Sequence, residues 1–203
     1  MKKEILLPLI ASASALRKIT ILEKLITEAK SRKIPFHKIY ETLLQNYLFT
    51  GYPSTLISLK VLKEMYPSRK LPKAADMNLY HFRKIGEANC KKVYGTKYEK
   101  LISNIKKFSP DLAEWLVLEG YGKVLGRKGL TLKEREPCIV AVLSSLKFEN
   151  QLFSHINGAF RAGASIQDIR AVIESIQLIG NKNLTYFGLR VLRRFENVKG
   201  TQH

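Results

Sequence analysis

The spacing of apolar residues predicts helices over most of the chain. Between Phe36 and Phe49, apolar side chains return every three or four positions, which is the period of one buried face of an α-helix. Breaks are expected at Pro35 and at Gly51, because proline and glycine interrupt helices. Further helices are expected over residues 4–34, 53–65, 78–94 and 97–107, and another begins at Pro110.

Two helices joined by a short turn are expected between Thr131 and Gly163. Thr131 and Glu134 have the spacing of a capping box, in which each side chain satisfies a backbone N–H of the first helical turn. The first helix is apolar on nearly all sides, and the second begins near Phe148 and ends at Gly163. Antiparallel packing of such a pair is expected to bring Glu136 and His155 within reach of each other.

The first part of the chain resembles the last part when it is shifted by 130 residues. Core-type residues then coincide, such as Leu22 with Leu152 and Ala29 with Ala159. The breaks at Pro35 and Gly51 fall on Ser165 and Asn181. This agreement favours a tandem duplication, although chance similarity between amphipathic helices explains part of it. Glu136 and His155 fall on Leu6 and Leu25, so the first copy is expected to have no site of its own.

Composition narrows the class of protein. About 45% of the 203 residues are hydrophobic, which is typical of a globular domain, and no apolar run is long enough for a membrane span. The first residues superficially match a secretory signal, but Glu4 interrupts their basic start, and a cytoplasmic location is expected. The formal net charge of +18 attracts polyanions. Because the basic residues are spread along the chain, a solvated surface is favoured over a nucleic-acid site.

The sequence lacks the patterns of the commonest ligand sites. The glycines between 120 and 129 match no phosphate-binding loop and follow a helix rather than a strand. The histidines and the two cysteines, Cys90 and Cys138, are too dispersed for a zinc site or a redox motif. Neither a metal nor a cofactor is therefore expected.

The segment around His155 resembles the carboxymuconolactone decarboxylase and alkylhydroperoxidase D-like superfamily. The resemblance rests on Glu136 and His155 with 18 residues between them, on the HI-x-x-A that starts at His155, and on Gly163 with the following IQDIRAVI. The peroxidase branch has cysteines where this chain has Phe148 and Gln151. The chain therefore looks more like the decarboxylase branch, although Phe153 stands where that branch often has an arginine.

The resemblance implies an all-α fold, an antiparallel helical bundle of the alkylhydroperoxidase D-like type. With the repeat, it predicts a degenerate copy over 1–66, a linker over 67–81, a decarboxylase-like domain over 82–197 and a tail over 198–203. Family members are commonly trimers or hexamers. We therefore expect a homo-oligomer, either a trimer of pseudo-dimers or a hexamer.

The resemblance also implies a reaction, the cofactor-independent loss of carbon dioxide from a carboxylated lactone or related small acid. His155 would deliver or relay the proton, and Glu136 would orient its imidazole. Substrate-binding roles are predicted for four further residues: Gln151, Tyr121, Lys123 and Arg127. The alternatives are a non-catalytic or diverged oligomeric relative that binds a small molecule, then a non-specific nucleic-acid binder. A peroxidase relay ranks last because the cysteine pair is missing.

Overall fold

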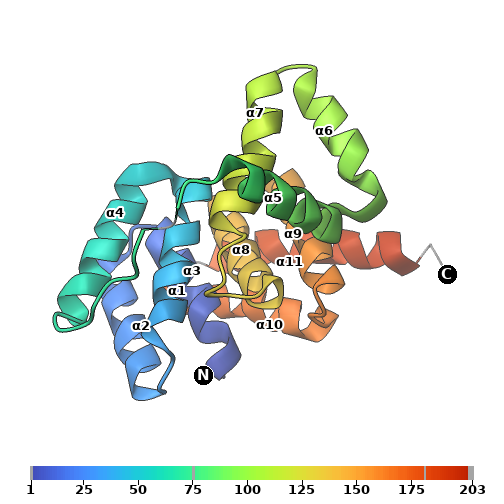
Figure 1. Ribbon diagram of the computed structural model, residues 1–203. Helices are drawn as coiled ribbons and strands as arrows, with labels where there is room; N and C mark the ends of the chain where they lie inside the picture. Colours follow the sequence, from blue (N-terminus) through green and yellow to red (C-terminus); the bar gives the residue numbers. More distant parts are fainter. Residues whose placement is uncertain (1, 75, 181, 201–203) are drawn as a thin grey trace. The chain divides into compact units, whose positions relative to one another are not determined.

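The computed structural model describes residues 2–74, 76–180 and 182–200, and within these ranges it is helical and contains no β-strand (Figure 1). The predicted all-α class is therefore confirmed. Asn181, His203 and residue 75 of the predicted linker lie outside the described residues. Among the described helices, none combines the length and the apolar character that a membrane span needs.

The chain forms two compact units. Unit 1 consists of Met1–Leu71 together with Gly129–His203, and unit 2 consists of Pro72–Lys128. We call residues 2–71 the N-terminal half of unit 1 and residues 129–200 its C-terminal half. These units follow contacts in space. The four predicted segments follow the proposed repeat and the family pattern, and their bounds stay a prediction.

Both halves of unit 1 are built of helices. The N-terminal half contains η1 (Lys3–Ile5), α1 (Leu6–Ala15), α2 (Ile19–Ser31), α3 (Phe36–Gln45) and α4 (Tyr47–Met65). The C-terminal half contains α8 (Leu132–Leu146), α9 (Glu149–Arg161), α10 (Ile166–Ser175), η4 (Ile176–Ile179) and α11 (Lys182–Gly200). The expected break at Gly51 is present as a kink within α4, because Gly51 has a φ of 70°.

The helix bounds of the two halves agree at the 130-residue shift. Helices α2 and α9 begin and end at positions 130 residues apart, and so do α3 and α10. The residues that follow α1 and α8, Arg17 and Lys147, have φ angles of 56° and 59°. Lys33 and Gly163 after the next helices also have positive φ angles. The agreement thus extends from residue type to backbone conformation.

Helices α1 and α8 meet at the centre of unit 1. Ala11 and Ala15 of α1 pack with Cys138 and Val142 of α8, and all four are buried. Small side chains at such a contact allow two helices to approach closely. Burial raises the pKa of the Cys138 thiol to about 12, so the group stays protonated at neutral pH and acts as a core residue.

The predicted start of α8 is confirmed. The Thr131 N–H donates to the Glu134 carboxylate at 3.0 Å, and the capping box is complete. Lys38 of α3 forms an ion pair with the same carboxylate. Burial alone would raise the pKa of Glu134, but the hydrogen bonds from Lys38 and Thr131 outweigh it, and the pKa is lowered. The contact fastens the first turn of α8 to the N-terminal half.

Unit 2 is built on a close contact between two helices. Its elements are α5 (Leu79–Tyr94), η2 (Gly95–Lys97), α6 (Tyr98–Lys106), α7 (Pro110–Trp115) and the π-helical segment η3 (Leu116–Val124). A Cβ on Gly86 of α5 would lie 2.1 Å from the Val117 carbonyl oxygen of η3. A Cβ on Gly122 would lie 2.2 Å from the Phe82 carbonyl oxygen. The two backbones are therefore in direct contact at both glycines.

Replacement of Gly86 by alanine is expected to destabilise unit 2 by about 1–3 kcal/mol or more, because the methyl group would displace backbone and not a flexible side chain. Urea unfolding followed by the fluorescence of Trp115 measures the effect. Gly200→Ala is the matched control, because nothing lies within 4 Å of its added Cβ. Equal stability of the two variants would contradict the close contact.

Candidate functional site

Glu136 and His155 meet at the packed helices α8 and α9. His155 Nδ1 lies 2.8 Å from Glu136 Oε2. The Glu136 side chain is fully buried and that of His155 is 8% exposed. The predicted approach of these two side chains is therefore present in the structure, while their catalytic roles stay a prediction.

The contact fixes the state of the imidazole. An ionised carboxylate can only accept hydrogen bonds, so Nδ1 of His155 must carry the proton that it shares with Glu136. The other ring nitrogen, Nε2, is then the atom available to take up or release a proton. A carboxylate at this distance can also stabilise a charged imidazole ring.

A buried ion pair involves Arg135, the residue before Glu136 on α8. Arg135 of α8 is fully buried and donates from Nη2 to Glu41 of α3 at 3.0 Å and from Nη1 to Gln45 at 3.1 Å. The sequence analysis did not identify these residues. A signal existed in the 130-residue comparison, in which Arg135, Glu41 and Gln45 fall on Ile5, Ala171 and Ser175.

An aromatic ring of the N-terminal half packs against the imidazole of His155. Phe49, in the first turn of α4, meets His155 edge to face, with ring centroids 6.1 Å apart and ring planes at 85°. Phe49 also packs against the buried contact of α1 with α8. The surroundings of His155 therefore come from both halves of unit 1.

The four predicted substrate-binding residues are divided between the units. Gln151 is exposed on α9, one turn before His155. The other three belong to unit 2. Tyr121 is buried and its hydroxyl lies 3.1 Å from that of Tyr94, whereas Lys123 is half-buried and pairs with Glu119. Arg127 is half-buried, and the substrate-binding role of all four stays a prediction.

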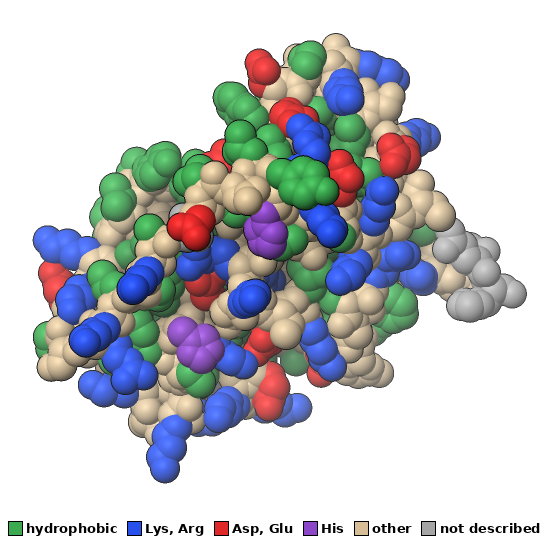
Figure 2. Space-filling view, viewed as in Figure 1, with side chains coloured by type: hydrophobic (Ala, Val, Ile, Leu, Met, Phe, Trp, Pro, Cys, Tyr) green, Lys and Arg blue, Asp and Glu red, His purple; other side chains and the backbone are tan. Residues whose placement is uncertain are grey.

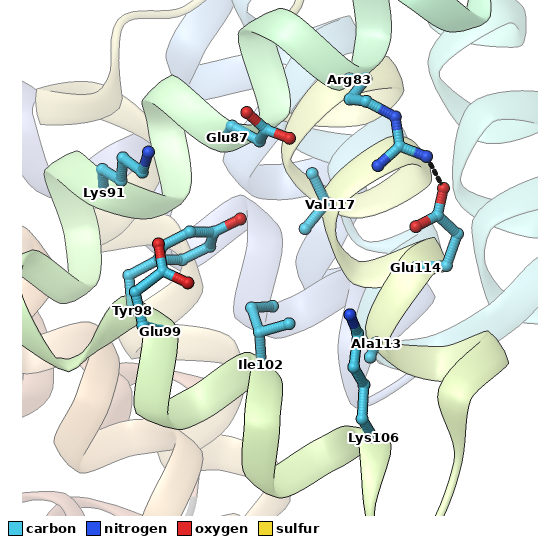
Figure 3. A pocket seen from close by; sticks show the side chains of 10 residues that line it. All are labelled: Arg83, Glu87, Lys91, Tyr98, Glu99, Ile102, Lys106, Ala113, Glu114 and Val117. Atoms are coloured by element: carbon cyan, nitrogen blue, oxygen red, sulfur yellow. Dashed lines mark hydrogen bonds and ion pairs between the residues drawn. The ribbon is translucent and has the colours of Figure 1, made fainter.

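Unit 2 contains a cavity of about 230 Å³ between α5, α6 and the segment formed by α7 and η3 (Figure 3). Its charged side chains balance, with three basic (Arg83, Lys91, Lys106) and three acidic (Glu87, Glu99, Glu114). Arg83 and Glu114 pair with each other, as the dashed line shows. None of the buried side-chain atoms that lack a partner among the described residues lines this cavity, so the Glu136–His155 pair is the stronger candidate.

The described residues contain no group of three or more histidine, cysteine or acidic side chains that would hold a metal ion. Both cysteines are buried as free thiols, and burial raises the pKa of Cys90 to about 12, as it does for Cys138. Neither thiol has the lowered pKa of a reactive cysteine.

A known family model matches the part of the chain that carries this site. Residues 110–192 match the model of the carboxymuconolactone decarboxylase family. The resemblance seen in the sequence is therefore confirmed over these residues. Both Glu136 and His155 lie inside the matched segment, whereas the N-terminal half lies outside it.

The chain is also similar to Peroxisomal protein 2 of Schizosaccharomyces pombe (strain 972 / ATCC 24843). The two are 27% identical over 138 residues, which cover 66% of this chain and 64% of the relative. The match thus spans less than two thirds of the relative's length.

Proposed function

We propose that the protein is a cofactor-independent decarboxylase of a carboxylated lactone or related small acid, which uses Glu136 and His155 as a proton relay. The observation that carries the proposal is the buried 2.8 Å contact between the two side chains. The family match over residues 110–192 supports the class of reaction. The particular substrate is part of the proposal.

The proposed reaction breaks the bond between a carboxylate and a lactone carbon. The electron pair of that bond passes into the conjugated lactone carbonyl, carbon dioxide leaves, and a proton returns to a carbon of the ring. His155 supplies that proton from Nε2 and is reprotonated from solvent. Glu136 holds the ring in place and offsets its positive charge while the proton is in transit.

The proposal is tested by incubating the purified protein with carboxymuconolactone. The expected result is release of one carbon dioxide per molecule consumed, followed by mass spectrometry of the dissolved gas and by ultraviolet absorbance. Release at the rate of a protein-free solution would contradict the decarboxylase proposal.

A diverged relative that binds a small molecule without decarboxylating it is the second candidate. It is supported by Phe153, which stands where decarboxylases of the family often have an arginine. The Phe153 ring packs against Phe195, with centroids 5.8 Å apart, and the Arg194 guanidinium lies 5.0 Å from the centre of the Phe153 ring. Saturable binding of carboxymuconolactone without gas release would favour this candidate. Peroxidase activity and nucleic-acid binding remain lower-ranked alternatives.

We further propose that the tandem copies arose by duplication and that the chain forms a homo-oligomer, either a trimer of pseudo-dimers or a hexamer. The agreement of helix bounds supports the duplication. Exposed apolar side chains support association of several copies of the chain, because large apolar patches on a surface often mark an interface between proteins. Three of them, Tyr52, Leu56 and Ile57, lie on α4, where Figure 2 shows hydrophobic side chains on the surface. Sedimentation as a monomer at micromolar concentration would contradict the oligomer.

The cytoplasm is the proposed location. The name of the relative from Schizosaccharomyces pombe points instead to the peroxisome for that protein, so a peroxisomal location is the alternative for this chain. Basic side chains are spread over the face in Figure 2 and do not form one block, which favours a small carboxylated partner over nucleic acid.

A further inference from the structure

The two halves of unit 1 meet in two equivalent regions of opposite chemical character. One region contains five polar residues that are each at most 6% exposed: Glu41, Gln45, Arg135, Glu136 and His155. The positions 130 residues away from these are Ala171, Ser175, Ile5, Leu6 and Leu25. Leu6 and Leu25 belong to one hydrophobic cluster with Ile179. Because burial of polar groups is costly, the polar region requires a reason beyond packing.

Gln45 and Glu136 each have a buried side-chain atom that lacks a hydrogen-bond partner among the described residues. The Arg135 guanidinium can only donate, so Gln45 must turn its amide oxygen towards it, which leaves the amide nitrogen as an unused donor. Glu136 Oε2 accepts from His155, and Glu136 Oε1 is left as an unused acceptor. Gln45 thus has an unused donor, and Glu136 has an unused acceptor. Buried atoms of this kind are seldom left without a partner, which can be a ligand or water.

Gln45 and Phe49 come from the same short stretch of chain. Gln45 ends α3, and Phe49 lies four residues later in the first turn of α4. Gln45 contacts Arg135 of α8, and Phe49 contacts His155 of α9. The junction of α3 and α4 thus lies along the helix pair that carries Glu136 and His155. Ile179, the counterpart of Phe49, packs in the same apolar cluster as Leu25, the counterpart of His155.

We propose that Gln45 and Phe49 of the N-terminal half complete the Glu136–His155 site. Gln45 Nε2 donates to a carbonyl or carboxylate oxygen of the bound acid, and Glu136 Oε1 accepts from a hydroxyl or water beside it. Phe49 closes the site over the imidazole. The nature of the ligand rests on the proposed function, whereas the composition of the site from both halves does not. The N-terminal half has leucines, Leu6 and Leu25, at the positions that correspond to Glu136 and His155. In this proposal it instead contributes one wall of the Glu136–His155 site.

Binding of acetate, the smallest stable carboxylate probe, tests the role of Gln45. Acetate is expected to shift the side-chain amide resonances of Gln45 and the ring resonances of His155 in ¹H–¹⁵N spectra. Gln45→Glu keeps an oxygen for Arg135 and removes the donor, so acetate binding followed at His155 should weaken by about tenfold or more. Gln177→Glu, the same change at an exposed position of η4, should leave binding unchanged.

Chemical modification of His155 tests the role of Phe49 without any substrate. Diethyl pyrocarbonate modifies accessible imidazoles, and peptide mass spectrometry measures the rate at His155. The rate is expected to rise several-fold in Phe49→Ala and to stay at the native value in Ile179→Ala, which removes the equivalent side chain from the apolar region. A similar rise in both variants would mean general loosening of unit 1 and would overturn the role of Phe49.

The results separate this inference from the proposed function. If carboxymuconolactone is not consumed but acetate shifts Gln45 and Phe49→Ala exposes His155, the composite site stands and the decarboxylase proposal fails. The opposite result is consumption of carboxymuconolactone while acetate leaves the Gln45 resonances unshifted and Gln45→Glu keeps native kinetics. The decarboxylase proposal then stands and the composite site fails. In the expected case, Gln45→Glu raises KM with a smaller change in kcat.

Discussion

Replacement of His155 by alanine is expected to lower the turnover of carboxymuconolactone by about two to four orders of magnitude, the contribution of a positioned proton donor. Ultraviolet absorbance of the substrate measures the loss, and circular dichroism checks that the variant is folded. His37→Ala is the matched control, because His37 is exposed at the start of α3 and should keep native turnover.

Glu136→Gln is expected to reduce turnover as well, by a smaller factor than His155→Ala. The amide that replaces the carboxylate can donate as well as accept, so it no longer obliges His155 Nδ1 to carry the proton. It also loses the negative charge that offsets the imidazolium. Native turnover in His155→Ala would contradict the proposed proton relay, whatever the turnover of Glu136→Gln.

Replacement of Glu41 by alanine is expected to destabilise unit 1 by about 3–5 kcal/mol, the usual cost of removing one partner from a buried ion pair. The Arg135 side chain is 0% accessible to solvent. Its charge would be left without the Glu41 carboxylate and could not reach water unless α8 lost its packing. Urea unfolding followed by circular dichroism gives the change in free energy. A loss below about 1 kcal/mol, as for a surface ion pair, would contradict the buried pairing.

The double variant Glu41→Leu with Arg135→Met separates the cost of an orphaned charge from the value of the ion pair. Apolar residues of similar size often replace a buried ion pair at little cost in stability. We therefore expect the double variant to be more stable than Glu41→Ala. Because Glu41 and Arg135 touch each other, the effects of the single changes should not add.

Much of the local structure could be predicted from the sequence because it depends on neighbours along the chain. The apolar period gave the helices, and the Thr131–Glu134 spacing gave the start of α8. The approach of Glu136 to His155 was predictable because the two helices are joined by a short turn. The residue in that turn, Lys147, has a left-handed conformation that its type does not suggest.

Contacts between distant parts of the chain could not be predicted in the same way. Glu41, Gln45 and Arg135 look like ordinary polar positions of amphipathic helices, because their burial depends on residues about 90 positions away. Comparison of the two halves of unit 1 at the 130-residue shift offers a remedy. A polar residue in one half that falls on a core-type residue in the other, as Glu136 falls on Leu6, indicates a position where burial serves something other than packing.

In the proposed reaction, one fixed residue, His155, returns the proton after carbon dioxide leaves. Turnover of carboxymuconolactone in deuterium oxide, followed by NMR of the product, tests it most directly. The expected result is a single deuterium on one face of the carbon that receives the proton, because a residue held in place delivers to one side. Product labelled equally on both faces, or no product above the protein-free rate, would contradict the claim.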